Sequence, residues 1–135
     1  MKNIKNIGFF TVLFSLSAIA SECWITDGYQ GHGAKAYENF KVNPDGMTST
    51  KYVIVVDGDK SKVLDNPISF IQVSANSILG LDVVNGKSVV ETWSVFPSEK
   101  KAIYTKTVNG YGVYDGAAMF VGKVVGSCNS EKKSK

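Results

Sequence analysis

The residues that could do chemistry are few and widely spaced. The chain has one histidine, His32, and two cysteines, Cys23 and Cys128. A zinc site draws three or four ligands from His, Cys and carboxylates, and this set is too small to supply one easily. An α/β-hydrolase would carry a G-x-S-x-G turn, which this sequence lacks. The sequence therefore predicts no metal, no cofactor and no enzymatic activity.

The segment Asp57-Gly58-Asp59-Lys60-Ser61 begins like a calcium-binding loop. Such a loop needs a glycine at its sixth position and a bidentate glutamate at its twelfth. Lys62 and Ile68 occupy those positions. A hairpin turn is the better interpretation.

Asp82 and Glu91 are the most interesting acidic residues. Each lies inside a β-rich run, at a similar distance from the hairpin signal Asn85-Gly86. If that turn sets the register, Asp82 pairs close to residue 90 or 91. An acid inside a strand usually faces solvent, and the alternative is that both acids line a barrel interior or groove.

The aromatic residues suggest two modes of binding. Trp93 and Tyr104 are expected to be large, buried residues of a central hairpin, and a subset of the aromatic residues could line a pocket for a small ligand. An enclosed pocket would support that function, whereas an interior filled by Trp93, Tyr104 and Phe120 would oppose it. Tyr111 and Tyr114 could instead be exposed anchors for a protein partner.

The segment Gly28–Gly33 does not match a phosphate-binding loop, and we expect a mobile loop there. Part of it, with the residues that follow, reads GHGAKAY at Gly31–Tyr37. This resembles the SGSGxKY loop of periplasmic lysozyme inhibitors, which are small secreted β-barrels. It lacks the leading serine pair and has Ala36 before Tyr37. The resemblance implies an inhibitor, which is one version of the wider hypothesis of a protein-interaction module such as a periplasmic inhibitor or immunity-type protein.

The N-terminus predicts export. Lys2 and Lys5 precede an apolar run that is too short to span a bilayer, and Ala18-Ile19-Ala20 fits a signal-peptidase site. We expect residues 1–20 to be a cleaved signal peptide, residues 21–128 a single β domain and residues 129–135 a disordered basic tail. The mature protein is then periplasmic or extracellular, with no stable membrane insertion.

Cys23 and Cys128 lie near the two ends of the mature chain. In an oxidising compartment they are expected to form a disulfide that closes a long loop. On the chain-entropy model, such a cross-link would raise the free energy of unfolding by roughly 4–5 kcal/mol. Two free buried thiols are the alternative.

The formal charge of +3 arises at the chain ends. Without the first 20 residues and the tail, the body of the chain is near −1. All 15 basic residues are lysines. Because arginine is the residue preferred for phosphate and base-edge recognition, nucleic-acid binding is not expected.

The clearest structural signal is a hairpin over Lys87–Gly110. Closely spaced turn signals, including Asn43–Gly46, Asn85-Gly86 and Asn109-Gly110, predict short antiparallel strands with no long helix. We expect an all-β fold of about eight or nine strands, a small barrel or sandwich, in which the disulfide joins the terminal strands. The expected strands are Ser21–Thr26, Ala34–Val42, Lys51–Val56, Ser61–Leu64, Ile68–Ser74, Ser77–Val84, Ser88–Phe96, Ala102–Val108 and Ala117–Gly126.

These features predict an exported, non-enzymatic binding protein. The first hypothesis is a small apolar or amphipathic ligand held by Trp93, Tyr104, Glu91 and Asp82. The second is a protein-interaction module that uses Tyr111 and Tyr114.

Overall fold

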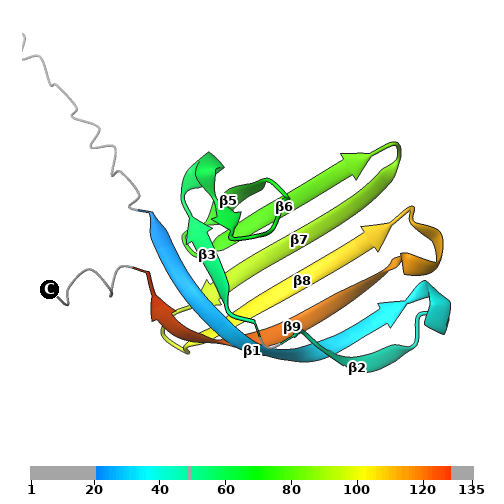
Figure 1. Cartoon of the computed structure of the whole chain (residues 1–135), viewed down its shortest axis with the longest axis horizontal. Coiled ribbons are helices and arrows are strands. Elements are labelled where there is room, and N and C mark those ends of the chain that lie inside the picture. Colours follow the sequence, from blue (N-terminus) through cyan, green and yellow to red (C-terminus); the bar gives the residue numbers. More distant parts are fainter. Residues whose placement is uncertain (1–20, 49, 129–135) are drawn as a thin grey trace, which may run out of the picture.

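The computed structural model describes residues 21–48 and 50–128, and these form one nearly closed antiparallel β-barrel (Figure 1). The strand order is β4-β3-β1-β9-β8-β7-β6-β5, and β2 also pairs with β1. The predicted barrel-type fold of eight or nine strands is confirmed. The strands are β1 (Glu22–Lys35), β2 (Val42–Gly46), β3 (Tyr52–Val56), β4 (Lys62–Val63), β5 (Phe70–Ser74), β6 (Ser77–Val84), β7 (Lys87–Phe96), β8 (Lys101–Asn109) and β9 (Gly116–Ser127).

Within the described residues, three single-turn 3₁₀ helices connect strands: η1 (Ala36–Glu38), η2 (Gly58–Lys60) and η3 (Gly112–Tyr114). No α-helix occurs in residues 21–48 and 50–128. The expected signal peptide and basic tail lie outside the described residues.

The predicted hairpin is the centre of a four-stranded meander, β6–β9. Trp93 pairs with Tyr104 across β7 and β8. Asn85 and Gly86 connect β6 to β7 with φ angles of 50° and 74°. Positive φ at both central residues matches the right-handed twist of the flanking strands. Local turn chemistry therefore fixes the register of this half of the barrel.

The first strand closes the barrel against the last one. β1 pairs with β9 along most of its length, and its other edge pairs first with β3 and then with β2. Cys23 and Cys128 form the predicted disulfide, with their Cα atoms 5.3 Å apart. The Cys128 N–H donates a hydrogen bond of 3.0 Å to the Cys23 carbonyl. The disulfide thus ties together the terminal strands, as expected.

The mobile loop expected at Gly28–Gly33 is wrong, because these residues continue β1. A register shift between Asp27 and Gln30 lets the strand bend, with Gly28 at φ 67°. A Cβ on Gly31 would lie 1.8 Å from the Met119 carbonyl oxygen. The glycine is needed for close approach of two strands, not for a flexible loop.

The neighbouring segments also differ from expectation. Ala34–Val42, for which the sequence favours a strand but also allows a turn of helix, is not one strand. It contains the end of β1, the helical turn η1, a turn and the first residue of β2. The turn predicted at Asn43–Gly46 belongs to β2, which pairs only with β1. Pro44 is tolerated there because an edge strand can leave one side of its backbone unpaired.

The two ends of the sheet path are β4 and β5, and a side-chain contact connects β5 to η2, which lies between β3 and β4 in the sequence. The Gly58 backbone N–H donates a 2.9 Å hydrogen bond to the Gln72 Oε1 atom. This contact brings η2 against β5 and narrows the opening between the two ends of the sheet.

Candidate ligand-binding site

The composition of the barrel interior changes along its axis. Alternate residues of β7, β8 and β9 point inward, and register places Trp93, Tyr104 and Phe120 side by side. Two residues further along these strands, the matching positions are Glu91, Lys106 and Ala118. A polar layer therefore follows directly on an aromatic layer.

The aromatic layer fills its level of the barrel. The Trp93 and Tyr104 rings stack with centroids 4.1 Å apart, and the Tyr104 and Phe120 rings stack at 5.9 Å. Trp93 is 2% exposed and Tyr104 is 7% exposed, which confirms their predicted burial. Trp93, Tyr104 and Phe120 thus fill the interior at this level, which is the arrangement expected to oppose a ligand enclosed between these rings.

Glu91 is the buried acid of the polar layer, with 3% of its surface exposed. Its Oε2 atom accepts hydrogen bonds from Asn66 Nδ2 at 2.8 Å and from Trp93 Nε1 at 3.4 Å. Its Oε1 atom lies 3.4 Å from the Lys106 ammonium. The carboxylate thus holds the β4–β5 connection against the barrel wall.

The phenol of Tyr104 is affected by the same carboxylate. Burial is the main cause that raises the pKa of Tyr104, and the charge of Glu91 and a hydrogen bond to it raise this pKa further. Tyr104 is therefore a neutral donor beneath the polar layer.

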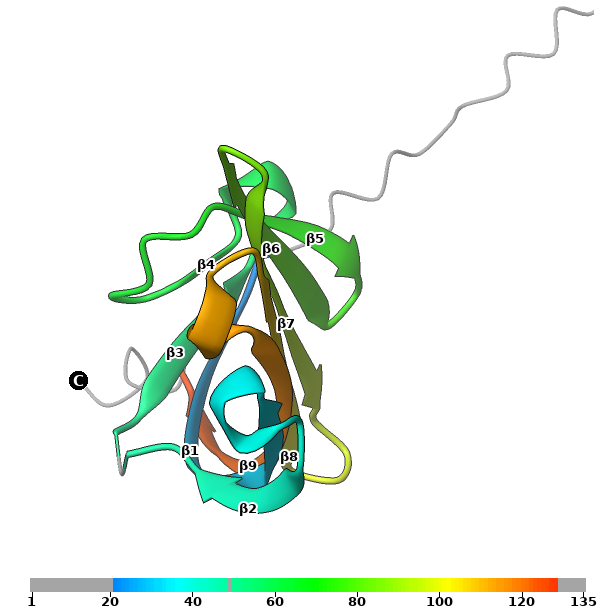
Figure 2. The same ribbon diagram turned by 90° about the vertical axis from the view of Figure 1, so that its right-hand side faces the viewer.

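Two clefts lie above the aromatic layer, and both include Lys106 in their walls. Figure 2 views the ribbon from the end of the barrel at which η1 and η3 contact each other. The first, here named the Lys35 cleft, has a volume of about 270 Å³. It is lined by Lys35, Asp45, Lys106, Val108, Tyr114, Gly116, Ala117, Ala118 and Phe120.

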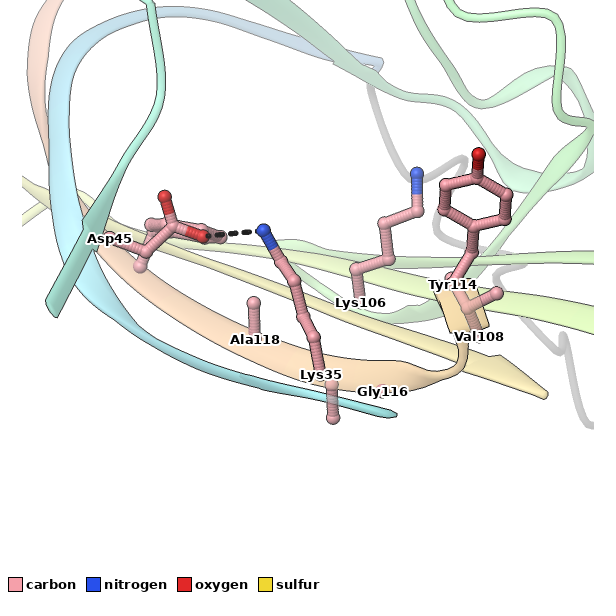
Figure 3. Close-up of a pocket in the computed structure, with 9 residues that line it drawn as sticks. Lys35, Asp45, Lys106, Val108, Tyr114, Gly116 and Ala118 are labelled. Atoms are coloured by element: carbon pink, nitrogen blue, oxygen red, sulfur yellow. Dashed lines mark ion pairs between the residues drawn. The ribbon is translucent and has the colours of Figure 1, made fainter. Parts of the chain in front are cut away.

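Figure 3 shows how the polar groups of the Lys35 cleft are arranged. Lys35 directs its ammonium at the Asp45 carboxylate, with Nζ 3.6 Å from Oδ2. Lys106 and Tyr114 extend in the same direction, away from the strands below them. The pKa of Lys35 is raised by its hydrogen bond with Tyr37 and by the charge of Asp45, so this ammonium stays protonated.

The second cleft, here named the Asp82 cleft, has a volume of about 440 Å³. It lies between the β4–β5 connection and the inner faces of β6 to β8. Three of the four predicted ligand-binding residues, Asp82, Glu91 and Trp93, line it, and the fourth, Tyr104, stacks beneath Trp93. The rest of its wall consists of Thr50, Lys51, Tyr52, Val63, Leu64, Asp65, Asn66, Pro67, Ile68, Val89 and Lys106.

The register of the two acids differs slightly from expectation. Asp82 pairs with Val89, and Glu91 pairs with Gly80. Asp82 is exposed at the edge of the cleft, whereas Glu91 is buried at its base. The two carboxylates share a cleft, but only Asp82 is open to solvent.

The two tyrosines expected to be interaction residues lie at the same end of the barrel. Tyr114 is 73% exposed in η3. Tyr111 is half-buried, with the Lys87 ammonium 5.2 Å from its ring centroid. Tyr114 is therefore the more accessible of the two.

Sequence reasoning missed the cations of the site. Lys106 lies two residues after Tyr104, and the period of a β-strand could have placed both on one face. Lys35 lies in a segment predicted as a strand and Asp45 in a predicted turn, and no spacing signal brings the two together. The single histidine, His32, pairs with Met119 and is exposed. The described residues contain no group of three or more potential metal ligands.

Comparison with known proteins finds no matching family model, curated protein or solved structure. Among the described residues, no helix has the length and hydropathy needed to cross a membrane.

Proposed function

We propose that this chain is an exported, non-enzymatic protein that binds a small amphipathic ligand in the Lys35 and Asp82 clefts. The observation that carries this proposal is that the two clefts share Lys106, directly above the aromatic layer. The ligand lies in this open half of the interior, not enclosed among the rings.

The linings support an amphipathic ligand. Phe120 and Val108 provide apolar surface in the Lys35 cleft, and Ile68 and Val89 do so in the Asp82 cleft. Each cleft adds a few polar groups, which is the usual composition of small-molecule sites. Export is supported by the signal-like N-terminus and by the disulfide, since disulfides persist outside the reducing cytoplasm.

The test is native mass spectrometry of the protein recovered from the exported fraction. We expect a bound molecule in the wild-type protein, and its loss in Val108→Trp or Val89→Trp, which fill one cleft each. Val121→Trp is the matched control, because Val121 is exposed on the outer face of β9. Unchanged occupancy in both cleft variants, or no bound molecule in the wild-type protein, would contradict the proposal.

A protein partner is the second candidate. Tyr37 and Phe40 are exposed beside η1, which contacts η3 and so lies near Tyr114. Phe40 is 58% exposed and has a φ of 56°. A bulky residue in the left-handed region is strained, and such strain often marks a functional site. Capture of a single protein that is lost in Phe40→Ser and Tyr114→Ser, with both clefts empty, would favour this candidate.

A further inference from the structure

We propose that the ligand is anionic, and that its carboxylate or phosphate monoester binds the ammonium groups of Lys35 and Lys106 in the Lys35 cleft. This inference rests on the proposed function and specifies the chemistry of its ligand.

The charges that line the Lys35 cleft favour an anion. Two ammonium groups face this space, but Asp45 is the only carboxylate among its lining residues. The acid that pairs with Lys106 is Glu91, which belongs to the wall of the other cleft. Among the lining residues an anion therefore meets two cations and one acid, while Glu91 pairs with Lys106 from the side of the other cleft.

Both ammonium groups keep bonding capacity for a ligand. Lys35 and Lys106 lie 3.6 Å and 3.4 Å from their carboxylate partners, beyond the 2.7–2.9 Å or so of the strongest charge-assisted bonds. Each ammonium has three donors. Lys35 interacts with Asp45 and Tyr37 and Lys106 with Glu91, which leaves at least one donor on each, and the two side chains are 41% and 42% exposed. The carboxylates position the lysines without burying them.

The rest of the cleft suits the apolar part of such a ligand. Phe120 and Val108 form part of its wall, and small residues of β9 leave the space open. A Cβ on Gly33 would lie 3.3 Å from the Asp45 Oδ2 atom. A glycine at this position lets Asp45 stay beside Lys35.

The Asp82 cleft offers less to an anion, because Asp65, Asp82 and Glu91 line it against Lys51 and Lys106. Its buried acid is already engaged by Asn66, Trp93 and Lys106. We therefore place the anionic group in the Lys35 cleft, and any extension of the ligand past Lys106 in the Asp82 cleft.

The test uses four probes with the same chain and different head groups: octanoate, octyl phosphate, octanol and octylamine. We expect calorimetry to give affinities for one or both anions at least about tenfold above that for octylamine. Binding of the anion should weaken as salt rises. The preference between octanoate and octyl phosphate identifies the head group.

Three variants connect the selectivity to the site. Lys35→Gln and Lys106→Gln should each weaken anion binding by roughly five- to tenfold and leave octanol binding unchanged. Lys123→Gln is the matched control, since Lys123 is an exposed lysine of β9 outside both clefts. Circular dichroism verifies that each variant is folded.

The outcomes separate this inference from the function on which it rests. If octylamine or octanol binds as tightly as the anions, or if neither lysine variant changes anion affinity, the anionic assignment is wrong but the binding function stands. If none of the four probes binds, the proposed function itself is contradicted.

Discussion

Glu91 and Lys106 face each other across β7 and β8, and their side chains meet at the boundary between the two clefts. The Oε1 atom of Glu91 lies 3.4 Å from Lys106 Nζ; the acid side chain is 4% exposed and the lysine 42%. Glu91 is therefore buried in the barrel, whereas Lys106 remains accessible to a ligand. Glu91 stabilises the barrel through its contacts with the β4–β5 connection, and the same carboxylate holds Lys106 in the wall of both clefts.

The first prediction concerns the buried acid. Glu91→Ala should lower the free energy of unfolding by about 2–4 kcal/mol, because the Asn66 amide and the Trp93 indole lose their acceptor. Glu91→Gln should cost less, since an amide oxygen can still accept. Urea unfolding measures both variants. Glu99→Ala, at an exposed position, is the control; if Glu91→Ala is as neutral as this control, Glu91 is not the anchor of the β4–β5 connection.

The second prediction concerns the disulfide. Replacing both Cys23 and Cys128 with serine should lower stability by about 2–5 kcal/mol, because the cross-link joins residues 105 apart in sequence. Denaturant unfolding with and without reductant measures this effect. Reductant should destabilise the wild-type protein and leave the double variant unchanged. Equal midpoints for the oxidised and reduced wild-type protein would refute a stabilising role.

The third prediction is a loss of stability at alkaline pH. Burial raises the pKa of Tyr29 to about 12, although a hydrogen bond with Thr26 opposes the shift. The pKa of Tyr104 is also raised. Because the unfolded chain releases these protons near pH 10, the stabilisation from both phenols is complete below about pH 10. The contribution of Tyr29 is lost as pH rises through about 12, and that of Tyr104 at higher pH still.

Absorbance of tyrosinate and urea midpoints between pH 9 and 12 test this prediction. Tyr29→Phe should reduce the slope of stability against pH, and Tyr114→Phe, at an exposed position, should not. A flat stability profile across this range would show that the buried phenols titrate normally.

The fourth prediction concerns glycines that contact rings. A Cβ on Gly80 would lie 2.5 Å from the Phe70 ring, so Gly80→Ala should destabilise the barrel by about 1–3 kcal/mol. Gly126→Ala is the matched control in another strand, because its nearest neighbour would be Ile25 Cδ1 at 4.0 Å. Thermal unfolding compares the two variants. A Gly80→Ala midpoint equal to that of Gly126→Ala would mean that the ring moves aside at no cost.

The sequence predicted the meander better than the rest of the barrel. β6 to β9 combine β-branched and aromatic runs with turn residues such as Asn85-Gly86, so local chemistry is enough to specify them. The second half of β1 and all of β2 contain glycines and a proline that signal turns locally. They become strands only because β9 and β1 pair with them, and that long-range pairing has no local signature.

The same contrast between local signals and long-range pairing explains which residues of the candidate site could be predicted. Trp93 and Glu91 were singled out from within a clear strand, and the structure places both in the wall of one cleft. Lys35 and Asp45 come together only when β2 pairs with the second half of β1. Asn66 reaches Glu91 across 25 residues of sequence. Contacts made by barrel closure could not be inferred from spacing alone.

The most direct test of the account is nuclear magnetic resonance titration of the labelled protein with octanoate. We predict saturable shifts concentrated at residues that line the Lys35 cleft, including Lys106, Val108 and Ala118, and much smaller shifts at Val121 and Lys123 on the outer face of β9. Shifts confined to the outer face or to Tyr37 and Phe40, or no shifts at any residue, would contradict ligand binding in the open half of the barrel.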